Sequence, residues 1–264
     1  VIYSRIKTHL NTIRQRLWKV RAKKVVLAQG LIERPLAIPG NDLPGVMSSS
    51  SIRGYINKYG VIPGNEVVIC TNNDDAYRTA LTLQRVGCNV KFIVDIRKDV
   101  NEDLIDLIKK AGIKVLLEHT VSSIKGKNEV NNVQIVNMSK NSNIQISKSI
   151  KVKVDLVGLS GGWTPAVHLF SQSGGKLFWD KKRFCFRPNK HVQEQITIGG
   201  CDGIFDFNKS IFDTINKTQM ILRELGIRSF KKFNFNLEAP PFTEKFGLFE
   251  DFISKNIYNT KDKA

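Results

Sequence analysis

The sequence predicts an α/β fold built around a parallel sheet, and three observations predict it. Short apolar runs that end in glycine recur along the chain, as they do in buried parallel strands. Amphipathic stretches with helix start and stop signals lie between several of them. The chain has 264 residues, 41% of them hydrophobic, which is enough for the core of one large domain or two small ones. Strands and helices that alternate in this way imply right-handed crossover connections.

The chain's first expected core element is the run KVVLA at 24–28, which is closed by a glycine and predicts a buried parallel strand. Residues 31–49 hold three prolines and two glycines, too many for a helix or a strand, and they predict an ordered crossing loop. A helix is expected at 48–59, with its N-cap at Ser50 or Ser51.

From residue 61 the chain is predicted to form a self-contained run of strand, helix, strand, helix and strand. The first helix is expected to end at Gly87 and the second at Gly112, because glycine stops a helix by adopting a left-handed conformation. Asn101 is the expected N-cap of the second helix, with acidic residues in the following turn. In order, the elements are expected at residues 64–70, 71–87, 89–95, 101–112 and 113–120.

After residue 120 the pattern becomes antiparallel. Residues 121–157 alternate in polarity, with turns at 126–128 and 141–143, which predicts a small meander. A buried strand with a glycine exit is expected at 154–162, followed by a hairpin-like region up to about residue 187. The remaining elements are expected to be a strand at 196–200, an amphipathic helix at 212–225 that ends at Gly226, and a linker or docking arm from residue 229.

The formal net charge of +17 raises the question of nucleic-acid binding. The basic residues are spread along the chain, however, and no long run of like charges occurs. A solvated Lys-rich surface is the favoured interpretation, and a basic non-enzymatic nucleic-acid-binding module is the second alternative. A steep salt dependence of binding to random DNA, about −0.9 per neutralised phosphate, would support that alternative.

The cysteines and the apolar runs bear on the expected location. Four cysteines are scattered without a CxxC pair, which is typical of free thiols in a reducing cytoplasm rather than of a disulfide framework or a zinc site. No apolar run approaches the roughly 18 residues of a membrane span. The chain starts with Val and lacks an apolar signal-peptide segment, so we expect it to begin inside a longer protein.

The segment TNNDDAYRTA at 71–80 lies where a nucleotide-binding βαβ unit has its phosphate loop. An acidic residue ends the next strand about 20 residues later, the position that bonds a ribose hydroxyl in NAD-binding units. The turn has no glycine, and its two acids occupy the helix end that attracts anions. NAD contact and a self-capped helix that has lost nucleotide affinity both stay open. The residues predicted to contact NAD here are Thr71, Asn72, Asn73, Asp74 and Asp95.

Three further segments end in glycine at expected carboxyl ends of strands, where α/β sheets place ligands. They are VLAQG at 26–30, GLSGGWTP at 158–165 and IGGCDG at 198–203. Glycine lets the backbone approach a cofactor closely. The residues predicted to contact a cofactor in these segments are Gly30, Gly161, Gly162, Trp163, Gly200 and Asp202.

Together these segments resemble flavoproteins in which an NAD-type domain is inserted into an FAD-type domain. VVLAQG resembles the strand that crosses between the two domains, VDLVGLSGGWTP the returning strand, and IGGCDG the terminal motif at the flavin. Residues 16–180, including ERPLAIPGNDLPGVM, TNNDDAYRTAL and SGGWTPAVHLFSQ, are similar in order and spacing to the alpha subunit of heterotetrameric sarcosine oxidase.

The resemblance implies a Rossmann-type NAD domain, made of a parallel sheet plus a small antiparallel meander, inserted into an incomplete FAD/NAD-type Rossmann domain. The implied division assigns 1–60 and 158–228 to the host domain and 61–157 to the inserted one. Residues 229–264 would lead toward a missing folate-binding domain.

The resemblance also implies a complex that oxidatively demethylates sarcosine to glycine, with formaldehyde or methylenetetrahydrofolate and hydrogen peroxide as the other products. FAD and FMN would act mainly through the beta subunit, NAD would bind the alpha subunit, and tetrahydrofolate would bind the missing C-terminal domain. The implied partners are beta, gamma and delta subunits, with sarcosine bound at a partner subunit. Neither nucleic acid nor a membrane is expected as a partner. This chain would supply a dinucleotide-binding scaffold and would be inactive by itself.

No catalytic residue or metal ligand is assigned in this chain. His168 and His119 are expected to be packed histidines that bond backbone groups. For Trp163, packing is favoured over stacking on a cofactor ring. Cys201 has no neighbouring cation or second cysteine in the sequence to activate it.

The nearer alternatives are alpha-type subunits of opine oxidase, dye-linked proline dehydrogenase or cyanide synthase. All of them share the core of two dinucleotide-binding domains. A folate-binding domain in the adjoining sequence would favour sarcosine oxidase.

Overall fold

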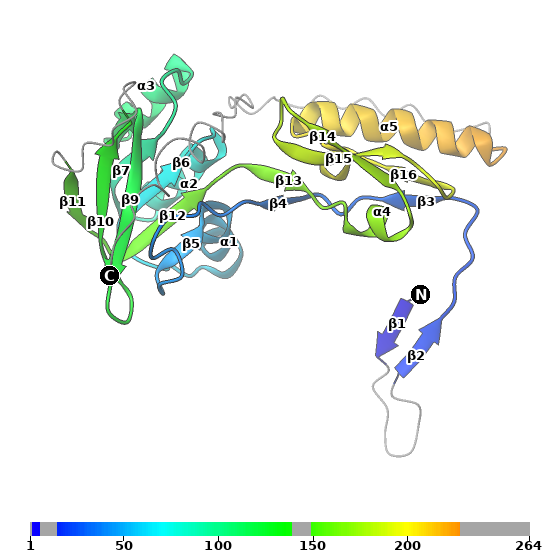
Figure 1. The fold of residues 1–264 in the computed structure, drawn as a ribbon, viewed down its shortest axis with the longest axis horizontal. Helices are drawn as coiled ribbons and strands as arrows, with labels where there is room; N and C mark the ends of the chain where they lie inside the picture. Colours follow the sequence, from blue (N-terminus) through cyan, green and yellow to red (C-terminus); the bar gives the residue numbers. More distant parts are fainter. Residues whose placement is uncertain (1, 6–14, 139–148, 228–264) are drawn as a thin grey trace, which may run out of the picture.

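The computed structural model describes residues 2–5, 15–138 and 149–227. Most of these residues form two lobes, which two extended segments connect, and the paired strands at 2–5 and 15–18 project away from both (Figure 1). The first lobe contains the central part of the chain, and the second contains segments that come before and after it in sequence. The expected turn at 141–143 and the expected linker from residue 229 lie outside the described residues.

The first lobe is built on a five-stranded sheet in which all neighbouring strands are parallel, which confirms the predicted fold class. The order is β5-β12-β6-β7-β8, so the chain returns to the inside of the sheet after it has formed the meander. The strands are β5 (Val46–Ser48), β6 (Glu66–Thr71), β7 (Asn89–Asp95), β8 (Lys114–Leu117) and β12 (Leu156–Ser160).

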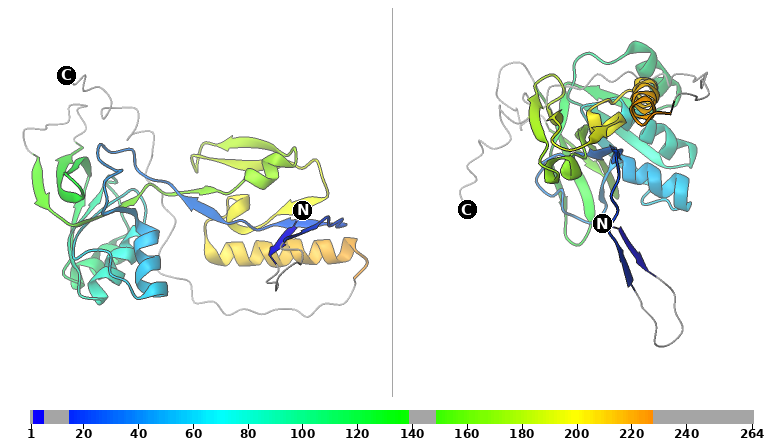
Figure 2. Two further views of the ribbon diagram at one scale, coloured as in Figure 1. Left: turned by 90° about the horizontal axis from the view of Figure 1, so that it is seen from below. Right: turned by 90° about the vertical axis from the view of Figure 1, so that its right-hand side faces the viewer.

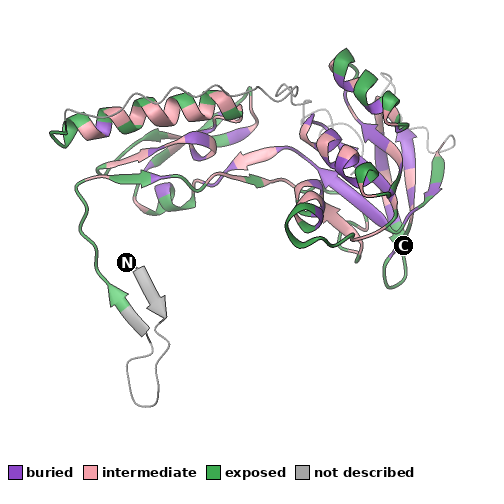
Figure 3. Cartoon of the chain, turned by 180° about the vertical axis from the view of Figure 1, so that it is seen from behind, coloured by how far each residue is buried: buried purple, intermediate pink, exposed green. Residues whose placement is uncertain are grey.

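Three helices cover one face of this sheet and an antiparallel meander covers the other. Alternation along β6 shows this, because Val67 and Ile69 pack with the helices whereas Val68 and Cys70 pack with the meander. Buried residues are concentrated in this lobe (Figure 3). The covering elements are α1 (Ser49–Tyr59), α2 (Asp75–Arg85), α3 (Glu102–Lys110), β9 (His119–Gly126), β10 (Val130–Asn137) and β11 (Ile150–Lys153).

The helix starts were predicted correctly at α3 and wrongly at α1. Asn101 caps α3, and its side chain accepts a backbone N–H from the first turn. The N-cap of α1 is Ser48 rather than Ser50 or Ser51. The backbone N–H of Ser50 instead donates to the carboxylate of Glu33, 2.9 Å away. An acid from a distant segment thus takes over the capping role that a local serine was expected to have.

The expected crossing loop at 31–49 is only partly a loop. Its first residues form β4 (Leu31–Glu33), which pairs antiparallel with β13 (Trp163–Pro165). This pair connects the two lobes (Figure 1). The last residues of the expected loop form β5. Prolines and glycines are confined to the stretch between these strands. The strand partners come from the far side of the inserted segment, so local composition could not reveal them.

A single residue divides the strand expected at 113–120. Glu118 has a φ of 56° and separates β8 from β9. A residue in the left-handed region interrupts the extended backbone of a strand. The chain therefore leaves the parallel sheet at this point and enters the meander.

The second lobe contains a two-stranded parallel sheet of β3 (Val25–Leu27) and β16 (Gln195–Thr197). The expected burial of this first strand is wrong, because Val25 and Val26 are 44% and 45% exposed. Among the described strands β16 is the one that pairs with β3, and a parallel sheet needs more layers to bury its strands. The strand expected at 196–200 ends early, since a 3-10 helix (Gly199–Asp202) begins at Gly199 with a φ of 59°.

The long helix α5 (Phe207–Glu224) lies along the second lobe (Figure 2). It begins earlier than the expected residue 212, because the side chain of Asp206 caps it by accepting the N–H of Lys209. The rest of the described chain comprises β1 (Ile2–Arg5), β2 (Gln15–Trp18), α4 (His168–Gln172), β14 (Lys176–Asp180) and β15 (Cys185–Lys190).

The predicted boundary between residues 60 and 61 runs through the first lobe. Both β5 and α1 precede it in sequence, and both pack on the parallel sheet. None of the helices described here is long and apolar enough to cross a membrane.

Candidate functional site

The candidate site lies at the carboxyl ends of β6, β7 and β12, the edge where parallel sheets place ligands. The structure brings together six of the predicted residues here. All six are buried, and they come from the turn before α2, the end of β7 and the segment after β12. They are Thr71, Asn72, Asn73, Asp74, Asp95 and Gly161.

The glycine-free turn is held by its own side chains. The hydroxyl of Thr71 accepts the N–H of Asn73 and donates to the carbonyl of Asn73, both at 3.0 Å. The side-chain amide of Asn73 donates to the carbonyl and hydroxyl oxygens of Ser160, at 3.2 and 3.0 Å. Its oxygen accepts the N–H of Asp75 at 3.1 Å. Polar side chains therefore replace the close backbone packing that glycines give to a phosphate loop.

Asp95 lies inside the lobe and is bound by groups of the same chain. Its side chain is fully buried and accepts hydrogen bonds from the guanidinium of Arg97 and, at 2.8 Å, from the hydroxyl of Tyr77. Arg97 also donates to Asp74 at 2.6 Å and is itself only 7% exposed. The buried cation thus bridges two buried carboxylates.

The charges of this buried group are mutually stabilised. Burial by itself would lower the pKa of Arg97, but hydrogen bonds and charge attraction from Asp95 and Asp74 outweigh it and raise that pKa. Burial, together with the charge of Asp95, raises the pKa of Tyr77, so its hydroxyl stays protonated and remains a donor. Sequence reasoning missed both residues. The sequence does contain one signal for Arg97, since it is a basic residue two positions after Asp95, the acid that ends β7.

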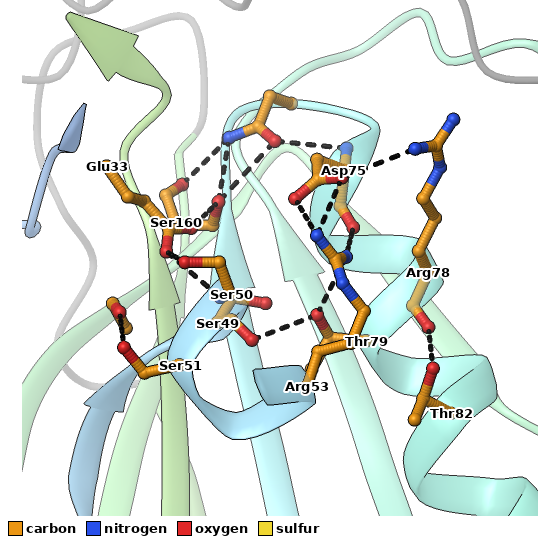
Figure 4. A network of polar contacts seen from close by, with 12 residues as sticks. Glu33, Ser49, Ser50, Ser51, Arg53, Asp75, Arg78, Thr79, Thr82 and Ser160 are labelled. Carbon is orange, nitrogen blue, oxygen red and sulfur yellow. Dashed lines mark hydrogen bonds and ion pairs between the residues drawn. The ribbon is translucent and has the colours of Figure 1, made fainter. Parts of the chain in front are cut away.

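A second polar network extends across the same edge (Figure 4). Arg53 of α1 binds the carboxylate of Asp75 through two contacts, at 2.8 and 3.1 Å, and Arg78 lies 3.8 Å from it. Glu33 of β4 accepts from Ser50 with one oxygen and from the hydroxyl of Ser160, at 2.8 Å, with the other. The crossing strand is thereby bonded to the sheet edge.

The predicted residues of the second lobe lie apart from this edge (Figure 1). A Cβ on Gly200 would lie 3.2 Å from the carbonyl carbon of Gly30, so these two glycines are neighbours. The carboxylate of Asp202 already has partners in this chain, since it accepts hydrogen bonds from Thr197 at 2.8 Å and from Lys217 at 2.6 Å. Open space surrounds the position that a Cβ on Gly30 would take.

Gly161 and Gly162 lie between the lobes and let the crossing strands, β4 and β13, approach each other closely. A Cβ on Gly161 would lie 2.7 Å from the carbonyl oxygen of Arg34. The carbonyl of Gly162 accepts the N–H of Arg34 at 2.8 Å, and Trp163 pairs with Glu33 across the ribbon. Close backbone approach was predicted for Gly161 and Gly162, and in this structure the approaching backbone belongs to the same chain.

The other side chains weighed from the sequence lie away from the candidate site. His119 bonds the carbonyl of Leu117 at 2.6 Å, as a packed histidine does. His168 is exposed at the start of α4, so its expected packing is wrong. Within α4 the buried residue is Phe170, two positions after His168. Among the described residues no group of three or more His, Cys, Asp or Glu could hold a metal.

We expect the four cysteines to be unreactive toward a thiol reagent in the folded protein. All four are free and buried, and burial raises the pKa of the Cys70 thiol to about 11. The thiolate is the reactive form, so little of it is present at pH 8. Titration with a chromogenic disulfide should detect no fast-reacting thiol in native protein and four after denaturation. Rapid reaction of native Cys70 would contradict the structure.

The residues at the first-lobe edge do not match the chemistry of dinucleotide binding. A pyrophosphate needs open N–H groups and positive charge, whereas Asp74 and Asp75 place two carboxylates at the start of α2. A ribose hydroxyl needs an acceptor it can reach, whereas Asp95 is fully buried and already bonded.

Comparison with known proteins reveals curated relatives. No family model matches the chain. It is 33% identical over 193 residues to the sarcosine oxidase alpha subunit of Corynebacterium sp. (strain P-1), and 30% identical over 213 residues to that of Rhizobium meliloti. These matches cover 73% and 81% of the chain but 20% of each relative, so the chain spans about a fifth of their length. An opine oxidase subunit of Rhizobium meliloti is 21% identical, over 68% of the chain and 43% of that relative.

Solved structures show the same fold. The L-proline dehydrogenase of P. horikoshii superimposes with a TM-score of 0.54 at 20% identity, over 79% of this chain and 36% of that one. The thioredoxin reductase of T. acidophilum also gives 0.54, at 18% identity, over 75% and 66%. The fold is therefore the Rossmann-type fold of FAD/NAD-dependent oxidoreductases, and the chain is a relative of part of the alpha subunit of sarcosine oxidase.

Proposed function

We propose that this chain is part of the alpha subunit of a flavin-dependent oxidoreductase complex that oxidatively demethylates sarcosine. The observation that carries this proposal is the similarity to three sarcosine oxidase alpha subunits along most of the chain. In the overall reaction sarcosine, water and oxygen give glycine, formaldehyde and hydrogen peroxide. With tetrahydrofolate, the one-carbon unit leaves as methylenetetrahydrofolate instead.

The role of this chain in the complex is that of a scaffold. The candidate site consists of groups that bind one another, and the cysteine next to it, Cys70, is buried with a raised thiol pKa. We therefore assign the flavin chemistry, with FAD and FMN, to a beta-type partner subunit, with gamma and delta subunits completing the complex. Folate would bind to a domain beyond this chain. The buried, unpaired thiols support the cytoplasm as its location.

Of the predicted cofactor contacts, those of the second lobe are best suited to NAD. Gly30 has a φ of 76° and open space beside it, so a ligand can approach its backbone. It follows β3 and adjoins Gly200 after β16, at the carboxyl ends of a parallel strand pair. NAD bound there would be held through backbone groups. Asp202 would not contact it directly, because its carboxylate is already paired with Lys217.

The test is to purify the complex through a tag on this chain and to measure substrate-dependent production of hydrogen peroxide. We expect turnover with sarcosine, and less free formaldehyde when tetrahydrofolate is added. Proline and an opine are the control substrates. Preferential oxidation of either would replace the proposal with an alpha-type subunit of proline dehydrogenase or opine oxidase, and the absence of a copurifying flavoprotein would refute both.

A further inference from the structure

We propose that the carboxyl edge of the first-lobe sheet binds no dinucleotide and instead holds the crossing strand β4. Carboxylates of this chain occupy the places where a dinucleotide would put its phosphates and ribose. The proposal is independent of which amine the complex oxidises.

The start of α2 is the first of these places. Asp74 and Asp75 lie there, and each is paired with an arginine of the same lobe, Arg97 at 2.6 Å and Arg53 at 2.8 Å. The partial positive charge of a helix start favours one anion, and here two are present. A pyrophosphate would have to displace both from their arginines.

The end of β7 is the second place. Asp95 accepts from Arg97 and Tyr77 with its two oxygens and is fully buried. To bond a ribose it would have to break the ion pair in which Arg97 also holds Asp74. A buried charge that loses its partner is strongly destabilising, so this exchange is unfavourable.

The start of α1 follows β5 at the same edge of the sheet, and the crossing strand β4 binds there through Glu33. Glu33 binds the backbone N–H of Ser50 at 2.9 Å and the hydroxyl of Ser160 at 2.8 Å. Ser160 in turn bonds Asn73 of the glycine-free turn. These hydrogen bonds connect the crossing strand, through the end of β12, to the glycine-free turn. In other α/β sheets this edge binds ligands, whereas here it holds β4 in position.

Hydrogen exchange on the tagged complex tests both parts of the proposal. With saturating NAD, and separately with FAD, we expect no added protection of the amides at 71–77. If NAD binds elsewhere in the complex, Asp95→Asn should change its dissociation constant by less than about twofold, whereas a lost ribose contact typically costs tenfold or more. Protection at 71–77, or a tenfold weaker dissociation constant, would overturn the first part.

Glu33→Gln tests the second part, because it keeps the shape of the side chain and removes its charge. We expect exchange at 31–34, 49–52 and 71–75 to become about tenfold faster while exchange in α3 stays unchanged. Exchange at 71–75 that is the same as in the wild type would refute the role of the edge in holding β4. If the variant fails to fold, the NAD experiment on the wild-type complex still decides the first part.

Discussion

Replacing Arg97 by methionine is expected to lower the free energy of unfolding by about 3–5 kcal/mol, the usual cost of removing one partner of a buried ion pair. Methionine fills much of the volume, so the loss comes from Asp74 and Asp95, which stay buried without their cation. Denaturant unfolding followed by fluorescence measures the change. Lys98→Met, which removes the same charge from the exposed neighbouring position, is the control and should change the value by less than about 0.5 kcal/mol.

The deficit of Arg97→Met should come from the charges and not from the volume of the side chain. The two carboxylates are the reason for that deficit. They lie at the start of α2 and at the end of β7, and Arg97 is the cation that pairs with both. A loss as small as that of Lys98→Met would mean that the paired charges matter little to the stability of the fold.

Replacing Gly40 by alanine is expected to cost about 2–5 kcal/mol. Gly40 has a φ of 84°, and a Cβ there would lie 2.2 Å from the backbone oxygen of Ile124 in β9. The left-handed conformation costs roughly 1–2 kcal/mol for alanine, and the overlap forces the crossing segment away from the meander at a further 1–3 kcal/mol. Thermal unfolding measures the effect.

Gly60→Ala is the matched control for that variant. Its φ of 65° is also left-handed, but the added Cβ would meet nothing within 4 Å. It should lose only the conformational part, about 1–2 kcal/mol. If the two variants were equally destabilised, the close approach of Gly40 to β9 would be wrong.

Most of the first lobe could be predicted from the sequence because its signals are local. The run at 89–95 forms β7 as expected, and Asn101 caps α3 by bonding a neighbour in the chain. The crossing strands could not be predicted, since β4 forms only by pairing with β13, far along the chain. Capping of α1 by Glu33 was missed for the same reason.

The candidate site, too, could be predicted only in part from the sequence. By itself the sequence determined a parallel sheet, a turn before a helix at 71–75, and an acid at the end of the next strand, because hydrophobic period and helix signals depend on near neighbours. Only the tertiary structure decided what those groups do. It brings Arg97 between Asp95 and Asp74, and Glu33 against Ser160. The partner of a buried charge is chosen by packing in three dimensions, so a pattern that resembles a nucleotide site becomes an edge on which the chain binds itself.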